Sequence, residues 1–201
     1  MARSLAKSTF VLLALGLWIL ASSACFAEDH LESLNQRIYK LFAEGKYQEA
    51  IPLAEKAIEI ARHARGPEDL VTATSLNNLA ELYRAMGEYA KAEPLYQEAL
   101  RIRQKMLGKE HPEVAASLSN LAALYWAMGE YAKAEPLLQE ALRIRQKVLG
   151  KGHPDVATSL SNLAELYYAM GEYPKAEPLL EEALRIRQKV LGPDSRVCPT
   201  L

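Results

Sequence analysis

The sequence predicts an all-α protein, a solenoid of about four antiparallel helix pairs, and two observations support this fold class. The first is an internal repeat of 42 residues, which is visible as evenly spaced glycines at Gly45, Gly87, Gly129 and Gly171. The second is that each repeat contains two successive apolar stripes with the 3.6-residue period of an α-helix. A helix with one such stripe cannot bury it alone, so neighbouring pairs must stack to form one continuous core.

Residues 1–27 differ from the rest of the chain and have the order of a secretory signal peptide. Basic residues precede an apolar run of about 11 residues, 10–20, and small residues follow it. We expect cleavage after Ala27, and therefore a periplasmic or secreted protein with no membrane span. Two alternatives remain open. One is a retained anchor, although the run is shorter than the roughly 20 residues that cross a bilayer; the other is lipidation of Cys25.

The repeat array is expected to span 28–192, followed by a short tail, 193–201. Its four copies cover residues 28–66, 67–108, 109–150 and 151–192. The segments 108–149 and 150–191 differ at only 7 of 42 positions. The first copy keeps the spacing but differs most in its other residues, as expected for a terminal repeat that has a neighbour on one side only.

The second copy illustrates the two helices of each repeat. One apolar stripe covers 73–86 and predicts the first helix, and another covers 89–106 and predicts the second. Gly87 interrupts the pattern between them, and Gly108 suits the C-cap of the second helix. In the next two copies, His111 and His153 each precede a proline that fits the first turn of a helix. We therefore interpret these histidines as loop or cap residues and not as metal ligands.

The composition favours an interaction protein over an enzyme. The chain has 24 Lys and Arg against 25 Asp and Glu, so there is no electrostatic argument for a nucleic-acid partner. Its two cysteines, Cys25 and Cys198, exclude a disulfide framework and a metal site built from four thiolates. The sequence contains no glycine-rich phosphate loop and no catalytic constellation. We predict no enzymatic activity, no cofactor and no metal.

The motifs of the second copy resemble the 42-residue tetratricopeptide repeat of the kinesin light chain type. They are LNNLAELY at 76–83, GEY at 87–89, AEPLY at 92–96 and the link from Leu107-Gly108 to His111-Pro112. The resemblance covers nearly all of 31–192 and implies a right-handed superhelix, here in an exported bacterial protein. It also implies that the first helix of each pair lines the concave side, where such repeats bind their ligands.

Two sets of residues lie off the apolar stripe of these first helices and are predicted to bind a peptide. One is a ladder of amides at a constant position, namely Asn78, Asn120 and Asn162. Each amide can donate and accept a hydrogen bond, as an extended peptide backbone requires, although bonding to the neighbouring repeat is an equally open alternative. The other set occupies one variable position of the repeat, namely Arg84, Trp126 and Tyr168. Aromatic anchors of this kind are typical of interface hot spots.

These observations predict a non-enzymatic protein- or peptide-binding scaffold or adaptor that is exported to the cell envelope. The alternative is a regulatory segment of a larger system, such as a truncated or split protein, because similar arrays precede caspase-like peptidase domains in some bacterial proteins. The last predicted helix, 173–191, keeps its apolar stripe but is followed only by the tail. We therefore also predict a homo-oligomer formed through the carboxyl end, where Cys198 would be available for an intermolecular disulfide.

Overall fold

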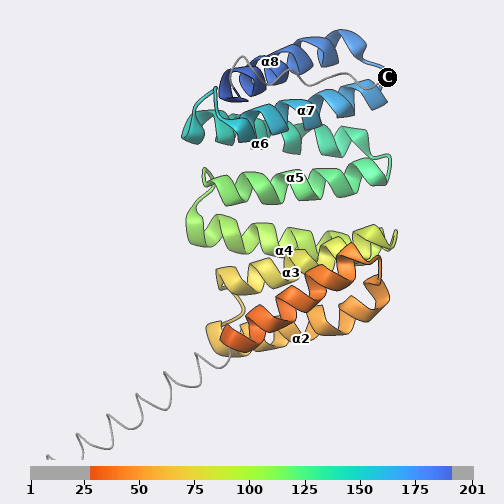
Figure 1. Ribbon diagram of the computed structural model, residues 1–201, viewed down its shortest axis with the longest axis vertical. Coiled ribbons are helices and arrows are strands. Elements are labelled where there is room, and N and C mark those ends of the chain that lie inside the picture. Colours follow the sequence, from red (N-terminus) through yellow and green to blue (C-terminus); the bar gives the residue numbers. More distant parts are fainter. Residues whose placement is uncertain (1–27, 192–201) are drawn as a thin grey trace, which may run out of the picture.

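The computed structural model describes residues 28–191, and the regular structure in this range is entirely helical. The range begins with a helical segment, 28–43, which is followed by seven helices. These are α2 (Tyr47–Arg65), α3 (Leu70–Ala85), α4 (Tyr89–Leu107), α5 (Pro112–Ala127), α6 (Tyr131–Leu149), α7 (Pro154–Ala169) and α8 (Tyr173–Leu191). The helices form antiparallel pairs that stack along one axis (Figure 1). The predicted all-α solenoid is confirmed, whereas the predicted signal peptide and tail lie outside the described residues.

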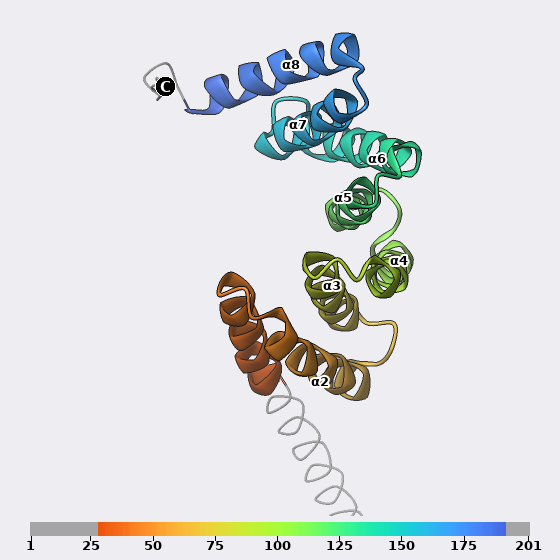
Figure 2. The same cartoon turned by 90° about the vertical axis from the view of Figure 1, so that its right-hand side faces the viewer.

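The stack is curved, and the two helices of each pair lie on opposite sides of the curve. Figure 2 shows the segment 28–43 and helices α3, α5 and α7 toward the inner side, with α2, α4 and α6 on the outer side. We call the surface formed by 28–43, α3, α5 and α7 the concave surface. The first helix of each pair therefore lines it, as the resemblance implies.

The two helices of each pair are joined by a tight turn that requires glycine. Gly87, two residues after the end of α3, has a φ of 76°, in the left-handed region that L side chains rarely adopt. Its N–H donates to the carbonyl of Arg84 at 3.0 Å, and the N–H of Glu88 donates to the carbonyl of Tyr83 at 2.9 Å. This is the Schellman pattern of helix termination. The turns at Gly129 and Gly171 have the same bonds, so the repeat spacing of these glycines marks the repeated turn.

The links between pairs end in side-chain caps. The Nδ1 of His111 accepts a hydrogen bond from the backbone N–H of Glu113 at 3.2 Å, at the start of α5. His153 accepts from Asp155 at 3.1 Å in the same way at the start of α7. Asp69 has this role for α3, at 2.8 Å. The interpretation of both histidines as cap residues is confirmed.

Neighbouring pairs are held together by a repeated polar contact as well as by the apolar core. The hydroxyl of Tyr125 on α5 donates to Glu93 Oε1 on α4 at 2.7 Å, and the Nζ of Lys133 lies 5.1 Å from the centre of its ring. At the next junction Tyr167 donates to Glu135 Oε1 at 2.8 Å. Buried alanines allow the helix backbones to approach closely around these contacts. The same polar contact thus joins neighbouring pairs at both junctions, and the two junctions differ only at other side-chain positions.

Candidate peptide-binding surface

The three asparagines of the predicted ladder occupy equivalent places on the concave helices but have different partners. Asn120 on α5 donates through Nδ2 to Asn77 Oδ1 on α3, at 2.9 Å. Its amide donor therefore joins two repeats, which is the alternative that the sequence left open. The Nδ2 of Asn78 and the Oδ1 of Asn35 are both buried without a partner. Asn35 and Asn78 have the same spacing in the repeat as the bonded pair, but no hydrogen bond joins these two atoms.

Asn162 differs from the other two because its counterpart has changed. The position equivalent to Asn77 is Ser119 in the third repeat, and a hydroxyl is shorter than an amide. Ser119 and Asn162 both line an open pocket, and the Oγ of Ser119 donates to the carbonyl of Ala115 at 2.9 Å. Of the three predicted asparagines, Asn162 is therefore the one whose amide lies in a pocket where a ligand could reach it.

Arg84, the first residue at the predicted variable position, is engaged within the protein. Its guanidinium bonds Glu81 one turn earlier on α3, and the hydroxyl of Tyr96 on α4 also donates to Glu81. Burial opposes ionisation of Glu81, but the bonds from Arg84 and Tyr96 outweigh it and hold the pKa of this carboxyl below its ordinary value. Burial and the bond to Glu81 raise the pKa of the Tyr96 phenol. This network fills the concave surface at the second repeat.

Trp126 and Tyr168, at the same position in the next two repeats, are exposed. The fractional exposures are 44% for Trp126 and 64% for Tyr168. The ring of Tyr168 meets that of Tyr173 edge to face, with centroids 5.0 Å apart. Both residues therefore lie off the packing stripe, and each presents an aromatic surface to solvent.

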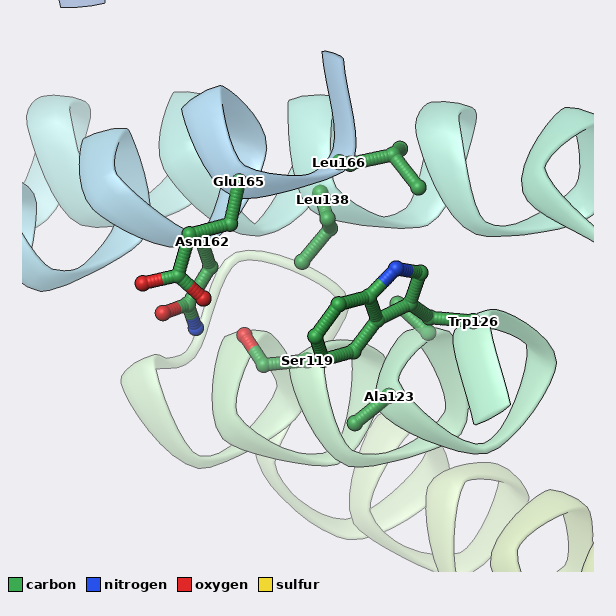
Figure 3. Close-up of a pocket in the computed structure, with 8 residues that line it drawn as sticks. Ser119, Ala123, Trp126, Leu138, Asn162, Glu165 and Leu166 are labelled. Carbon is green, nitrogen blue, oxygen red and sulfur yellow. The ribbon is translucent and has the colours of Figure 1, made fainter. Parts of the chain in front are cut away.

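The pocket lies between α5 and α7, with one side chain contributed by α6, and has a volume of about 140 Å³. Its lining consists of Ser119, Ala122, Ala123, Trp126, Leu138, Asn162, Glu165 and Leu166. Figure 3 shows the indole of Trp126 on one side and the polar ends of Asn162 and Glu165 on the other, with Ser119 between them. The site thus combines an aromatic wall, an aliphatic floor and a carboxylate.

A comparison of repeats explains why a pocket is present here. Tyr96 and Glu81 of the second repeat are replaced by Leu138 and Ala123 in the third. The side chain of Tyr96 is 1% exposed and reaches Glu81, so these two residues fill the corresponding space between α3 and α5. The third repeat has neither the phenol nor the carboxylate at these two positions, and the space beside Trp126 is therefore open. Sequence reasoning missed Leu138 as a site residue, although comparison of the copies position by position would have found it.

Two further observations concern the described part of the chain. Between residues 28 and 191, no group of three or more His, Cys, Asp and Glu side chains is arranged as a metal site. Among the helices of that range, none is long and apolar enough to cross a membrane.

The repeat family follows from comparison with known sequences. A family description, tetratricopeptide repeat, matches residues 29–105, 77–147 and 113–189, which together cover most of the chain. This chain belongs to the tetratricopeptide repeat family. Such repeats are generally non-catalytic scaffolds that bind proteins or peptides. No curated protein sequence gave a significant match.

Solved structures with similar folds include kinesin light chain-like proteins. BtubC (BKLC) from P. vanneervenii is 29% identical, with a TM-score of 0.73, over 85% of this chain and 69% of that chain. A putative kinesin light chain from Podosopora anserina, with nearly identical TPR-like repeats, is 32% identical with a TM-score of 0.67, over 80% and 76% of the two chains. The apo form of RapI is 21% identical with a TM-score of 0.68, over 81% and 57%, and supports the fold alone.

Proposed function

We propose that this protein is a non-enzymatic scaffold or adaptor, exported to the cell envelope, that binds an extended peptide segment of a partner protein on its concave surface. The observation that carries the proposal is the pocket beside Trp126. An exposed tryptophan next to an apolar hollow is the kind of anchor that dominates binding energy in protein interfaces. Asn162 adds a hydrogen-bonding group in the same pocket, and Tyr168 on α7 extends the aromatic surface.

The site can be tested with random peptides displayed on phage, panned against the full chain. We expect enriched peptides that bind with about micromolar affinity. Trp126→Ala should weaken the binding of these peptides at least tenfold, or by about 1.4 kcal/mol. The melting temperature should change by less than about 3 °C, because Trp126 is 44% exposed and belongs to none of the buried core clusters. Val148→Ala is the matched control, since Val148 is 48% exposed on α6 of the same repeat. Peptides that bind Trp126→Ala as well as they bind the unchanged protein would contradict the proposed site.

Export is supported by the order of residues 1–27: two basic residues, a short apolar run and small residues before Ala27. The sequence also leaves room for a lipid on Cys25, and the two outcomes differ in the amino terminus of the mature protein.

We also propose that two copies associate through α8. Leu180 on α8 is 45% exposed, whereas Leu138, at the equivalent position of α6, is 6% exposed because α7 covers it. Leu184, one turn further along α8, is also exposed. Apart from Lys175, which pairs with Glu172, the acidic residues of α8 precede its basic residues, and this order suits an antiparallel pairing with a second α8. The acidic residues are Glu177, Glu181 and Glu182, and the basic ones are Arg185, Arg187 and Lys189. A two-fold contact would place each acidic part opposite a basic part.

A further inference from the structure

The carboxylate of Glu165 lies at the pocket, and its repeat counterpart is a carboxylate with a complete set of partners. Glu165 is equivalent to Glu81, which binds the guanidinium of Arg84 and the hydroxyl of Tyr96. In that network the Nε of Arg84 lies 3.2 Å from Glu81 Oε2, and a terminal nitrogen bonds Oε1. The second repeat therefore contains an internal example of how this position holds a guanidinium with both carboxylate oxygens.

Both partners are missing around Glu165. In the fourth repeat, Tyr168 occupies the position equivalent to Arg84, and Leu180 occupies the position equivalent to Tyr96. The ring of Tyr168 packs against Tyr173 instead, and leucine has no hydrogen-bond donor. Within residues 28–191, no cation pairs with Glu165, and its side chain is exposed at the pocket. The fourth repeat thus keeps the acceptor of the second repeat without the arginine that occupies it.

The opposite wall of the pocket also suits a guanidinium. Trp126 presents its indole across the pocket from Glu165 (Figure 3), and a planar cation is attracted to the face of an indole. Ala123 and Leu138 supply an apolar surface for the methylene groups of an arginine stem. The volume of about 140 Å³ is close to that of cavities of about 150 Å³ that hold a benzene-sized group, so one side chain fits.

One cation of the protein lies beside this pocket without lining it. Arg145 on α6 donates to Ser159 Oγ at 2.5 Å and to Ser119 Oγ at 3.3 Å, and it is not among the lining residues. The guanidinium of Arg145 is held by these two hydroxyls and makes no ion pair with Glu165, so the Glu165 carboxylate has no cationic partner among the described residues.

We propose that this pocket binds one arginine side chain of the partner peptide, with its guanidinium between the carboxylate of Glu165 and the indole of Trp126. The partner's arginine would supply in trans the contact that Arg84 makes within the second repeat. This inference rests on the proposed peptide-binding function, which it makes more specific by naming the chemistry of one recognised residue.

The test uses small probes and the single indole of the pocket. In the full chain with Trp18→Phe, Trp126 is the only tryptophan, so its ¹⁵N-labelled indole gives one NMR signal. We titrate N-acetylarginine amide, N-acetyllysine amide and N-acetylcitrulline amide, the last being a neutral analogue of arginine. The arginine probe should shift the indole signal saturably, with a dissociation constant on the order of 1 mM, because one side chain makes few contacts. Citrulline should bind at least tenfold more weakly, and lysine should lie between the two, since an ammonium cannot form the bidentate contact.

Glu165→Gln should remove the preference for arginine over citrulline, whereas Glu59→Gln, which removes the same charge from an exposed site on α2, should retain it. Equal binding of arginine and citrulline, a preference that survives Glu165→Gln, or no arginine binding up to tens of millimolar would overturn the inference. Lysine that binds as well as arginine would overturn the assignment to arginine. Phage peptides that depend on Trp126 but contain no arginine would also overturn it while leaving the proposed function intact. If no Trp126-dependent peptide is found, the proposed function itself fails.

Discussion

Glu81 and Glu165 show how one residue type at one repeat position acquires two different roles. Glu81 is less than one-third exposed and is held by Arg84 and Tyr96, so it contributes to the stability of the protein. Glu165 is exposed and has lost both of these partners, so its charge remains available to a ligand. The local sequence around the two residues is nearly the same. The difference arises from the neighbouring positions, at 84 against 168 and at 96 against 180.

Glu81→Gln should destabilise the protein at pH 7, and this destabilisation should disappear in acid. The pKa of Glu81 is lowered in the folded protein, so its contribution is present above the unfolded value of about 4.3 and is lost as the pH falls through the folded value. We expect a decrease in the free energy of unfolding of about 1 to 2 kcal/mol at pH 7. Urea titrations at pH 7 and below pH 4 measure the change. Glu165→Gln is the matched control and should have little effect at either pH; equal losses for the two variants would contradict this account.

At the scale of the element, α8 differs from α4 and α6 in what covers it. Helix α4 is followed by α5, and α6 by α7, so Tyr96 and Leu138 on these helices are buried. The described residues place nothing over the equivalent Leu180, and its neighbour Leu184 is 56% exposed. An apolar stripe of this kind at the end of a repeat array favours association with another surface.

The double variant Leu180→Gln with Leu184→Gln tests the proposed contact between two copies of α8. Sedimentation velocity at tens of micromolar should detect a dimer for the unchanged protein and a monomer for the variant, because the apolar contact is lost. Val148→Gln on α6 is the control and should remain dimeric. Reductant distinguishes the apolar contact from a disulfide through Cys198, since only the disulfide is broken. A monomer at every concentration, with or without reductant, would contradict association through the carboxyl end.

At the scale of the whole molecule, the repeat array is separate in sequence from residues 1–27, which we propose to be a signal peptide. The four pairs supply a curved scaffold, and residues 1–27 precede its first described helical segment. If these residues are a signal peptide, mass spectrometry of protein from the periplasm or medium should find Glu28 at the amino terminus. An intact Met1, or a lipid on Cys25, would contradict cleavage after Ala27.

The sequence by itself determined the repeat, the helix pairs and the turns, because these depend on contacts between residues close together in the chain. The left-handed conformation of Gly87 and the cap of His111 each involve atoms only a few residues apart. The spacing of apolar residues likewise identified which face of each helix is buried. These features could be predicted before any helix was placed against another.

Only the tertiary structure decided what the residues of the concave surface contact. Asn120 bonds Asn77, which is 43 residues away, and this bond depends on the alignment of α3 with α5. Arg84 was predicted as a ligand contact but is occupied by Glu81, whereas the space beside Trp126 is open because Leu138, which α6 contributes, is smaller than its counterpart Tyr96. Periodicity specifies which side of a helix faces its neighbours. It does not specify which side chains meet across the junction, because the packing of the two helices sets that register.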